Sequence, residues 1–413
     1  MSTTLDMRPA TTAGDTWAIG APRLLAGLDR YPWLSLSAHT AVHGSQPGID
    51  LDRLMALLET SRLTGRGGAG FPLAAKLRAL HGTHPRVIVN GSESEPASFK
   101  DRTLLRRTPH LVLDGAAAVG AALNAREVIV AVHDAAAYES VRRAVSERPD
   151  RARIQLVRTD GRFLGGEARA LVRGIDGGPT VPPGRRDHPG LSGNLVSNAE
   201  TFAQTAILLR RGARAFAETG TPDEPGTVLL TVGGAVGRPG VVEAPLGTPL
   251  GILLQAAGSA PASLVVTGGY HGAWVLPDPA IRISRAGLAR AGGALGAGVI
   301  YVLDDATCAL GELSRVAGWL AAESAKQCGP CRFGLPALAA DVAALANGHP
   351  GALSNAASHA RAVDGRGACS HPDGAVRFIS SGLQALPAEI EAHRHGGCGR
   401  PVLGRLPITG GQL

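Results

Sequence analysis

Between residues 49 and 214, short runs rich in β-branched residues alternate with stretches of helical length. A helical crossover returns the chain to the same end of a sheet, so strands joined in this way pair in parallel. The region therefore predicts a layered α/β domain with a mainly parallel sheet. The expected strands are residues 87–89, 128–132 and 154–157, and the expected helices are 51–60, 73–80, 109–123, 135–146 and 200–209.

Two further changes of pattern divide the rest of the chain. After the Pro- and Gly-rich segment 219–225, β-rich runs surround one helical stretch, which predicts a small α+β domain. The runs are 227–234, 240–244 and 264–268, and the helix is 249–257. From residue 310, apolar residues recur at helical spacing and predict a helical bundle. We therefore expect domains at 1–222, 223–300 and 301–413, with an extended arm over the first forty residues and a long loop at 176–193.

Composition excludes several classes of protein. With 413 residues, 44% hydrophobic and 18% charged, the chain can bury a sizeable core and is not predicted to be disordered. No run of about 18 apolar residues spans a bilayer, and residues 1–20 lack the pattern of a signal peptide. We expect a cytoplasmic protein that is at most peripheral on the inner face of a membrane. The net charge of +7 is spread over dispersed arginines with few aromatic residues, so no nucleic-acid partner is predicted.

The first segment that indicates chemistry is Gly65-Arg-Gly-Gly-Ala-Gly-Phe-Pro72, followed by Lys76. Closely spaced glycines let the backbone approach a ligand and point several N–H groups at it, which predicts an anion cradle. The glycine spacing, and the helix that precedes the loop, exclude a dinucleotide-binding fingerprint. A plain turn between helices is the alternative. Lysine occurs only three times, at Lys76, Lys100 and Lys326, and each of the three lies in a segment that carries a candidate motif.

Polar residues 90–102 follow the expected strand 87–89 directly. Loops at the carboxyl ends of parallel strands are where α/β sheets bind ligands. Asn90 can donate to and accept from a planar heterocycle, and Glu93 or Glu95 can accept from sugar hydroxyls or an amide. A solvated acidic turn is the alternative interpretation.

Two further turns precede predicted helices. Gly166-Glu167 opens one, and Ser197-Asn198 stands at the start of another. Such residues contact ligands. Glu167 can equally be a favourable partner of the helix dipole, and Ser197 and Asn198 can be ordinary helix caps, so the sequence leaves both interpretations open.

Five cysteines in a long, unexported chain favour thiols or metal ligands over disulfides. Cys328-Gly-Pro-Cys331 is followed 38 residues later by Cys369. This spacing indicates an iron–sulfur cluster, a zinc ion or a redox pair, in that order of preference.

Taken in order, these segments resemble the flavin-binding, NADH-oxidising subunit of bacterial NADH:quinone oxidoreductase (complex I) and its relatives in NAD-linked hydrogenases and formate dehydrogenases. The resemblance runs from residue 50 to residue 395 and includes Glu93-x-Glu-Pro96, Phe99-Lys-Asp-Arg102 and Cys328-Gly-Pro-Cys-Arg332. It implies a layered α/β domain that binds flavin mononucleotide (FMN), a central soluble-ligand-binding β-grasp domain and a cluster-binding helical domain. Hydride transfer from NADH to FMN and single-electron release to the cluster are the implied chemistry.

The resemblance also implies roles for individual residues. FMN would contact Gly65, Arg66, Gly67, Gly68, Gly70, Lys76, Asn90, Glu93, Gly166, Glu167, Ser197 and Asn198. Glu95 and Phe71 would face the nicotinamide nucleotide, and Glu95 and Glu167 are the expected catalytic residues. Cys328, Cys331, Cys369 and His371 would hold an iron–sulfur cluster, of the 4Fe-4S type or a three-iron form. Electrons would pass to a ferredoxin-like or other redox subunit, in association with a membrane complex.

This chain departs from the family pattern at several positions. Ser92 and Ala168 replace acidic residues, and the Pro-rich segment 179–183 lacks the family's lysine, so flavin binding is supported better than NADH binding. Ala325 replaces the first cysteine of the family's Cys-x-x-Cys-x-x-Cys. Cys308 is too distant to substitute for it, because 17 helical residues span about 25 Å.

His371, two residues after Cys369, is the expected fourth ligand, and Cys398 is a weaker one. Three hypotheses follow from these motifs and departures. The first is an NADH-oxidising flavoprotein. The second is a non-catalytic relay or assembly subunit that keeps the flavin fold, and the third is a zinc-stabilised scaffold.

Overall fold

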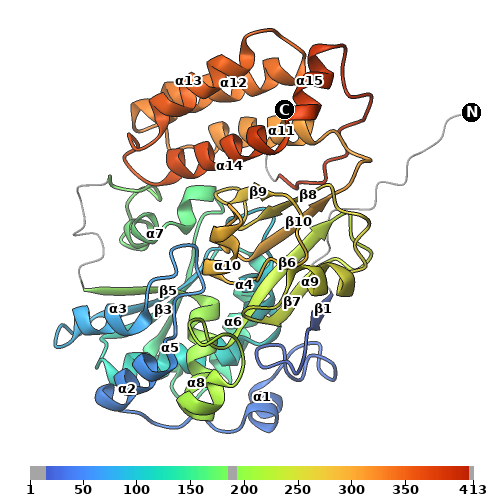
Figure 1. Ribbon diagram of the computed structural model, residues 1–413. Helices are drawn as coiled ribbons and strands as arrows, with labels where there is room; N and C mark the ends of the chain where they lie inside the picture. The colour runs from blue at the N-terminus through green and yellow to red at the C-terminus, as the bar shows by residue number, and fades with distance from the viewer. Residues whose placement is uncertain (1–14, 185–192, 409–413) are drawn as a thin grey trace, which may run out of the picture.

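The computed structural model describes residues 15–184 and 193–408, so the predicted loop 176–193 lies partly outside the described residues. A parallel-sheet domain forms one end of the molecule, a mixed sheet lies in the middle, and helices cover the other end (Figure 1). The predicted fold class is confirmed.

The first sheet has four parallel strands in the order β4-β3-β2-β5. The strands are β2 (Arg86–Gly91), β3 (Glu127–Val132), β4 (Ile154–Arg158) and β5 (Asn194–Asn198). Val87, Ile88 and Val89 are fully buried, as expected for a strand covered by helices on both faces. All three predicted strands are present. The sequence missed β5 because only Leu195 and Val196 interrupt its polar residues.

The helices around this sheet are α2 (Leu51–Ser61), α3 (Leu73–Leu80), α4 (Lys100–Arg107), α5 (Pro109–Ala122), α6 (Ala135–Ser146), α7 (Ala168–Ile175) and α8 (Ala199–Ala217), with α1 (Leu36–His43) before them. All five helices predicted around this sheet are present, as α2, α3, α5, α6 and α8, whereas α1 and α4 were not predicted. The α5 and α8 helices cross in close contact. A Cβ added to Gly115 would lie 1.9 Å from the carbonyl oxygen of Phe202, so only glycine permits this approach.

The second sheet is mixed, with six strands in the order β1-β7-β6-β10-β8-β9. The strands are β1 (Thr16–Ala18), β6 (Thr227–Gly234), β7 (Gly240–Pro245), β8 (Leu264–Thr267), β9 (Ala273–Val275) and β10 (Val299–Leu303). Helices α9 (Leu250–Ala256) and α10 (Arg285–Arg290) belong to the same part of the chain. Strand β10 crosses the predicted division at residue 300, and β1 joins this sheet from the N-terminal arm.

The arm is packed rather than merely extended. The backbone N–H groups of Arg23, Leu24 and Leu25 donate to the carboxylate of Glu243 on β7. Leu24 and Leu34 are fully buried. The arm therefore joins the parallel-sheet domain to the mixed sheet.

Helices form the remainder, as predicted. They are α11 (Ala309–Ala322), α12 (Leu335–Ala346), α13 (Ala352–Val363), α14 (His371–Ala385) and α15 (Pro387–Arg394), with a π-helical turn at Pro330–Gly334. These helices lie over one end of the mixed sheet, and α7 of the first domain lies below α14 (Figure 1). Within the described ranges, no helix has the length and apolar character needed to cross a bilayer.

Candidate functional site

The glycine loop lies at the carboxyl edge of the parallel sheet. It is closed by a hydrogen bond from the N–H of Gly65 to the carbonyl of Phe71 (2.9 Å). A Cβ added to Gly67 would lie 3.6 Å from the Cβ of Asn198, at the end of β5. Because Asn90 on β2 pairs in register with Asn198, the loop and the acidic turn share one edge of the sheet. The structure thus brings together the two segments on which the predicted site depends.

Two cations hold the carbonyl side of this loop. The guanidinium of Arg285, from α10, donates to the carbonyls of Gly65 (2.8 Å), Gly67 (2.9 Å) and Gly68 (3.1 Å). The ammonium of Lys100 donates to the carbonyl of Arg66 (2.9 Å). Both side chains come from outside the loop, so its backbone orientation is set by residues distant in the sequence.

This arrangement turns three N–H groups in the opposite direction. In a planar trans peptide the N–H points away from the carbonyl of the preceding residue. The N–H groups of Gly67, Gly68 and Ala69 therefore face away from Arg285 and Lys100. No described residue accepts a hydrogen bond from any of the three. Neighbouring backbone donors without a protein acceptor fit an anion such as a phosphate.

A buried ionic cluster supports the loop from below. The Lys100 ammonium lies 2.5 Å from a Glu200 carboxylate oxygen, and both side chains are almost fully buried. The other Glu200 oxygen accepts from the N–H of Leu229 on β6 (2.9 Å), which links the two sheets. Burial opposes the charge of Lys100, but the Asp101 and Glu200 carboxylates outweigh that effect and raise its pKa. Burial raises the pKa of Asp101 to about 7.

Glu93 is used within the protein. Its carboxylate accepts from the N–H groups of Asp101 (3.0 Å) and Arg102 (2.9 Å) and from the hydroxyl of Ser98 (2.6 Å). These contacts satisfy the first turn of α4, whose N-cap residue, Phe99, offers no side-chain acceptor. The structure therefore gives Glu93 a capping role, and its predicted contact with FMN stays a prediction.

Glu95 joins the acidic turn to the mixed sheet. Its carboxylate accepts from the N–H of Tyr270 (2.9 Å), after β8, and from that of Ala97 (3.4 Å). Burial raises the pKa of Glu95 to about 7, more than these hydrogen bonds lower it. This carboxyl group can therefore hold or release a proton near neutral pH.

The turn before α7 approaches the acidic turn closely. Asn90 donates through its side-chain amide to the carbonyl of Gly166 (2.8 Å). A Cβ added to Gly166 would lie 2.7 Å from the hydroxyl oxygen of Ser94, so glycine is required there. Glu167 caps α7 by accepting from the N–H groups of Arg169 and Ala170, both at 3.0 Å. Glu167 is therefore the N-cap of α7, and its contact with a ligand stays a prediction.

Three other predicted residues differ in accessibility. Lys76 reaches the end of β5, where it donates to the carbonyl of Val196 (2.8 Å) and lies 3.4 Å from the Ser197 hydroxyl. Burial lowers the pKa of Lys76. Phe71 is 51% exposed at the loop. The guanidinium of Arg66 points inward and donates to the carbonyl of Pro225 (3.1 Å), so it is not available to a ligand.

The cysteines predicted to bind the cluster lie near one another. Cys331, in the π-helical turn, is buried and interacts electrostatically with Cys328 and Cys369. Cys369 is 6% exposed and interacts electrostatically with Cys328 and with Glu167 of the first domain. Burial raises the pKa of both Cys331 and Cys369. Through Cys369, this group of cysteines therefore interacts with Glu167, in the turn that borders the glycine-loop edge.

His371 has protein partners at both ring nitrogens. Its Nε2–H donates to the carbonyl of Leu320 (2.9 Å), and its Nδ1 lies 2.9 Å from Nε2 of His271. Burial lowers the pKa of His371 to about 4, which keeps the ring neutral. The proton therefore resides on Nε2, and the single lone pair, on Nδ1, is used by His271. These contacts give no support to His371 as the fourth metal ligand.

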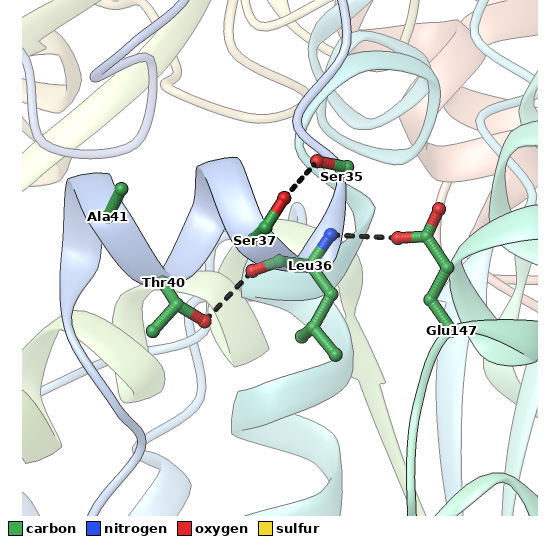
Figure 2. Close-up of a pocket in the computed structure, with 6 residues that line it drawn as sticks. All are labelled: Ser35, Leu36, Ser37, Thr40, Ala41 and Glu147. Atoms are coloured by element: carbon green, nitrogen blue, oxygen red, sulfur yellow. Dashed lines mark hydrogen bonds between the residues drawn. The ribbon is translucent and has the colours of Figure 1, made fainter.

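A surface hollow beside α1 has no sign of a binding role. It is lined by Ser35, Leu36, Ser37, Thr40, Ala41 and Glu147, and its volume is about 760 Å³. Figure 2 shows that the polar groups drawn there are paired: Glu147 accepts from the N–H of Leu36 (2.7 Å), and Thr40 donates to the carbonyl of Leu36 (2.8 Å). This hollow lies where α1 meets the end of α6, distant from the carboxyl edge of the sheet.

Sequence reasoning missed two residues that hold the loop. Lys100 could have been singled out because it is one of only three lysines, but nothing in the sequence distinguishes its partner Glu200. Arg285 lies more than 200 residues after the loop, and no local pattern relates the two.

Comparison with known proteins identifies both regions. Residues 58–206 match the family described as the Nuo51 FMN-binding domain, and residues 311–393 match the NADH-ubiquinone oxidoreductase-F iron-sulfur binding region. The F subunit of the Streptomyces coelicolor NADH-quinone oxidoreductase is 30% identical over 379 residues, which cover 84% of each chain. The F 2 subunit of the Rhizobium meliloti enzyme is 28% identical over 374 residues, covering 83% of this chain and 89% of that one.

Solved structures agree with these matches. The NAD+-reducing NiFe-hydrogenase in its H2-reduced state superposes with a TM-score of 0.79 at 26% identity, over 90% of this chain and 66% of that chain. The same hydrogenase in its air-oxidized state superposes with a TM-score of 0.80 at 26% identity, over 93% of this chain and 68% of that chain. This chain thus spans about two thirds of the hydrogenase chain.

Proposed function

The chain belongs to the family of NADH-quinone oxidoreductase F subunits, and from this premise we propose which of its residues bind the cofactors. It is an NADH-oxidising flavoprotein with an FMN-binding domain and a 4Fe-4S-binding region. When bound, FMN accepts a hydride from NADH and passes electrons singly to the cluster.

The N–H groups of Gly67, Gly68 and Ala69 bind the FMN phosphate. The observation that carries this assignment is that these three donors have no acceptor within the described residues, while the carbonyls behind them are held by Arg285 and Lys100. Positive charge on the carbonyl side adds to the attraction for an anion on the other side. Ala69 was not among the predicted residues, because it lies between glycines and its side chain carries no signal.

Lys76, Asn90, Ser197 and Asn198 complete the flavin side of the site. Each lies on or next to the carboxyl ends of β2 and β5, where α/β sheets bind ligands. Lys76 supplies a positive charge next to the phosphate-binding loop. Asn90 is already fixed by its hydrogen bond to Gly166, so its orientation does not depend on the ligand.

Phe71 and Glu95 serve the nicotinamide nucleotide. Phe71 offers an exposed aromatic face at the loop. Glu95 offers a carboxyl group whose proton is exchangeable near pH 7. This part of the assignment rests on the resemblance and on these two properties.

Cys328, Cys331 and Cys369 hold the iron–sulfur cluster. Thiolates are the usual ligands of such clusters. Cys369 interacts with Cys328 and with Glu167, in the turn before α7 that borders the flavin site. We do not include His371 as the fourth ligand, because its lone pair already accepts a hydrogen bond from His271.

The partner is another redox subunit. Relatives of this chain are named as subunits of NADH-quinone oxidoreductase, and the structural matches are NAD+-reducing hydrogenases. We propose that the protein acts in the cytoplasm, peripheral to such a complex, and delivers electrons from the cluster to a ferredoxin-like subunit.

The test is anaerobic mixing of the purified protein with NADH. We expect one FMN and a four-iron signal per chain, with loss of the yellow flavin absorbance within the mixing time. Flavin that stays oxidised would instead identify a relay subunit that does not oxidise NADH. Absence of flavin after incubation with FMN would overturn the assignment of the glycine loop.

A further inference from the structure

A second group of metal-ligating side chains lies apart from the three cysteines of the proposed cluster site. Its members are Cys308, Glu389, His393 and Cys398, and one ligand atom of each lies within 4.8 Å of those of all the others. Cys308 and Cys398 fall outside residues 311–393, the matched iron-sulfur region. This group is therefore not explained by the proposed function.

Three segments build the group. Glu389 and His393 are four residues apart on α15, so they project from one face of that helix. Cys308 is the N-cap of α11, and its sulfur accepts from the N–H of Gly311 (3.2 Å). Cys398 follows α15 in a turn where Gly397 and Gly399 adopt positive φ values of 107° and 71°. That turn reverses the chain and returns Cys398 to the other ligands.

The spacing fits a single zinc ion. The Sγ of Cys308 lies 3.3 Å from Nε2 of His393. With Zn–S near 2.3 Å and Zn–N near 2.0 Å, a tetrahedral ion would separate these atoms by about 3.5 Å. No two ligands of one zinc ion stand more than about 4.6 Å apart. A four-iron cluster would need wider spacing, because each thiolate binds a different iron.

The surrounding hydrogen bonds orient the ligands. The Nδ1–H of His393 donates to the carbonyl of Ala346 (2.6 Å), which leaves the lone pair on Nε2 free to coordinate. Glu389 accepts from the N–H of Leu310 (3.1 Å) and from the guanidinium of Arg400 (3.1 Å). Its carboxylate still has lone pairs for a metal. Hydrogen bonds that orient the ligands in this way are typical of protein metal sites.

We propose that Cys308, Glu389, His393 and Cys398 bind one structural zinc ion. Two thiolates and an imidazole are ligands that zinc prefers, and four protein ligands leave no open position for a substrate. The ion would join α15 and the turn after it to the start of α11. Residues beyond Cys398 then run along α11: Pro401 accepts from the N–H of Cys308 (2.8 Å), and Arg405 donates its N–H to Glu312 (2.9 Å).

The first test is zinc and iron content of the full-length protein, purified anaerobically. We expect about one zinc per chain in the wild type. Cys398→Ser and His393→Ala should lower zinc at least fivefold and leave iron and FMN unchanged. His395→Ala is the matched control, since His395 is exposed and bonded to Glu391, and it should keep its zinc. Cys328→Ser should give the reverse result, with iron lost and zinc retained.

The second test does not depend on how the variants fold. Wild-type protein is stripped of zinc and loaded with Co²⁺, whose spectrum reports thiolate coordination and tetrahedral geometry. We expect a thiolate charge-transfer band that saturates at one Co²⁺ per chain and disappears when Zn²⁺ is added. No such band would overturn the proposal. So would a Cys308–Cys398 disulfide in the anaerobic protein, or loss of iron rather than zinc in Cys398→Ser.

Discussion

The glycine-loop edge and the C-terminal helices position their ligand-binding groups in different ways. At the loop, the groups that face the ligand are backbone N–H donors, and their direction is fixed by two buried or half-buried cations on the opposite side. In the helices, the ligand-facing groups are thiols, an imidazole and a carboxylate that converge from separate segments. The glycine-loop site therefore depends on the two cations that hold its carbonyls, whereas each metal site depends on how the helices that carry its ligands pack together.

This contrast makes the two ends separable by mutation. Changes to the cations behind the loop should weaken FMN binding and spare the metals. Changes in the helices should affect metals and spare the flavin.

Lys100→Met should have the largest effect. It leaves Glu200 buried without its ionic partner, and breaking a buried pair in this way costs about 3–5 kcal/mol in the free energy of unfolding. The loop also loses the donor that holds the Arg66 carbonyl. We expect a marked fall in the urea midpoint and in bound FMN. Arg142→Met, which breaks an exposed pair on α6, is the control and should leave both unchanged.

The free energy of unfolding should fall as pH rises from 5 to 8. The pKa of Glu95 is about 7 in the folded protein and near 4.5 in an unfolded chain, so in this window the folded state keeps a proton that the unfolded state has lost. Ionising the buried carboxyl then costs about 3 kcal/mol.

Urea unfolding of Glu95→Gln at both pH values measures this cost. The variant should lose less stability than the wild type between pH 5 and pH 8. Part of the dependence will remain, because burial also raises the pKa of Asp101. An unchanged difference between the two pH values would show that Glu95 is ionised throughout.

Arg285→Ala should weaken FMN binding by roughly 10- to 100-fold, since it removes hydrogen bonds from a charged donor to three loop carbonyls. Zinc and iron content should not change. Arg290→Ala, on the same helix, is exposed and serves as the control in a fluorescence titration with FMN. If both variants bind FMN equally well, Arg285 does not orient the loop.

His371→Ala should have the smallest effect, and FMN binding should not change. We expect iron content per chain to be retained, because the lone pair of His371 is used by His271 and not by the cluster. Loss of one iron, or conversion of the four-iron signal to a three-iron signal, would restore His371 to the ligand set.

The parts that the sequence predicted are those encoded locally. Helical periodicity gave α3 (Leu73–Leu80) and α6 (Ala135–Ser146) with the observed bounds, and β6 (Thr227–Gly234) was also placed correctly. The sequence did not predict α4 (Lys100–Arg107), because six of its eight residues are polar or charged. Lys100, Arg102 and Arg106 are paired here with Glu200, Glu93 and Asp134 of other segments, which no periodicity reveals.

The same limit applies to the sites. A glycine loop is contiguous, so its backbone donors were predictable, but the orientation that Arg285 imposes was not. At the metal end, Cys328 and Cys331 form a local motif, whereas Cys308 and Cys398 are 90 residues apart and meet only through the packing of α11 and α15. The distance along a helix from residue 308 to residue 325 excluded Cys308 as a ligand of the predicted cluster. A second metal site that includes Cys308 was not considered.

The most direct measurement compares FMN with riboflavin, which lacks the phosphate, on deflavinated full-length protein. If the N–H groups of Gly67, Gly68 and Ala69 bind the phosphate, we expect FMN to bind at least about 100-fold more tightly. Equal dissociation constants for the two flavins would contradict the assignment of the glycine loop.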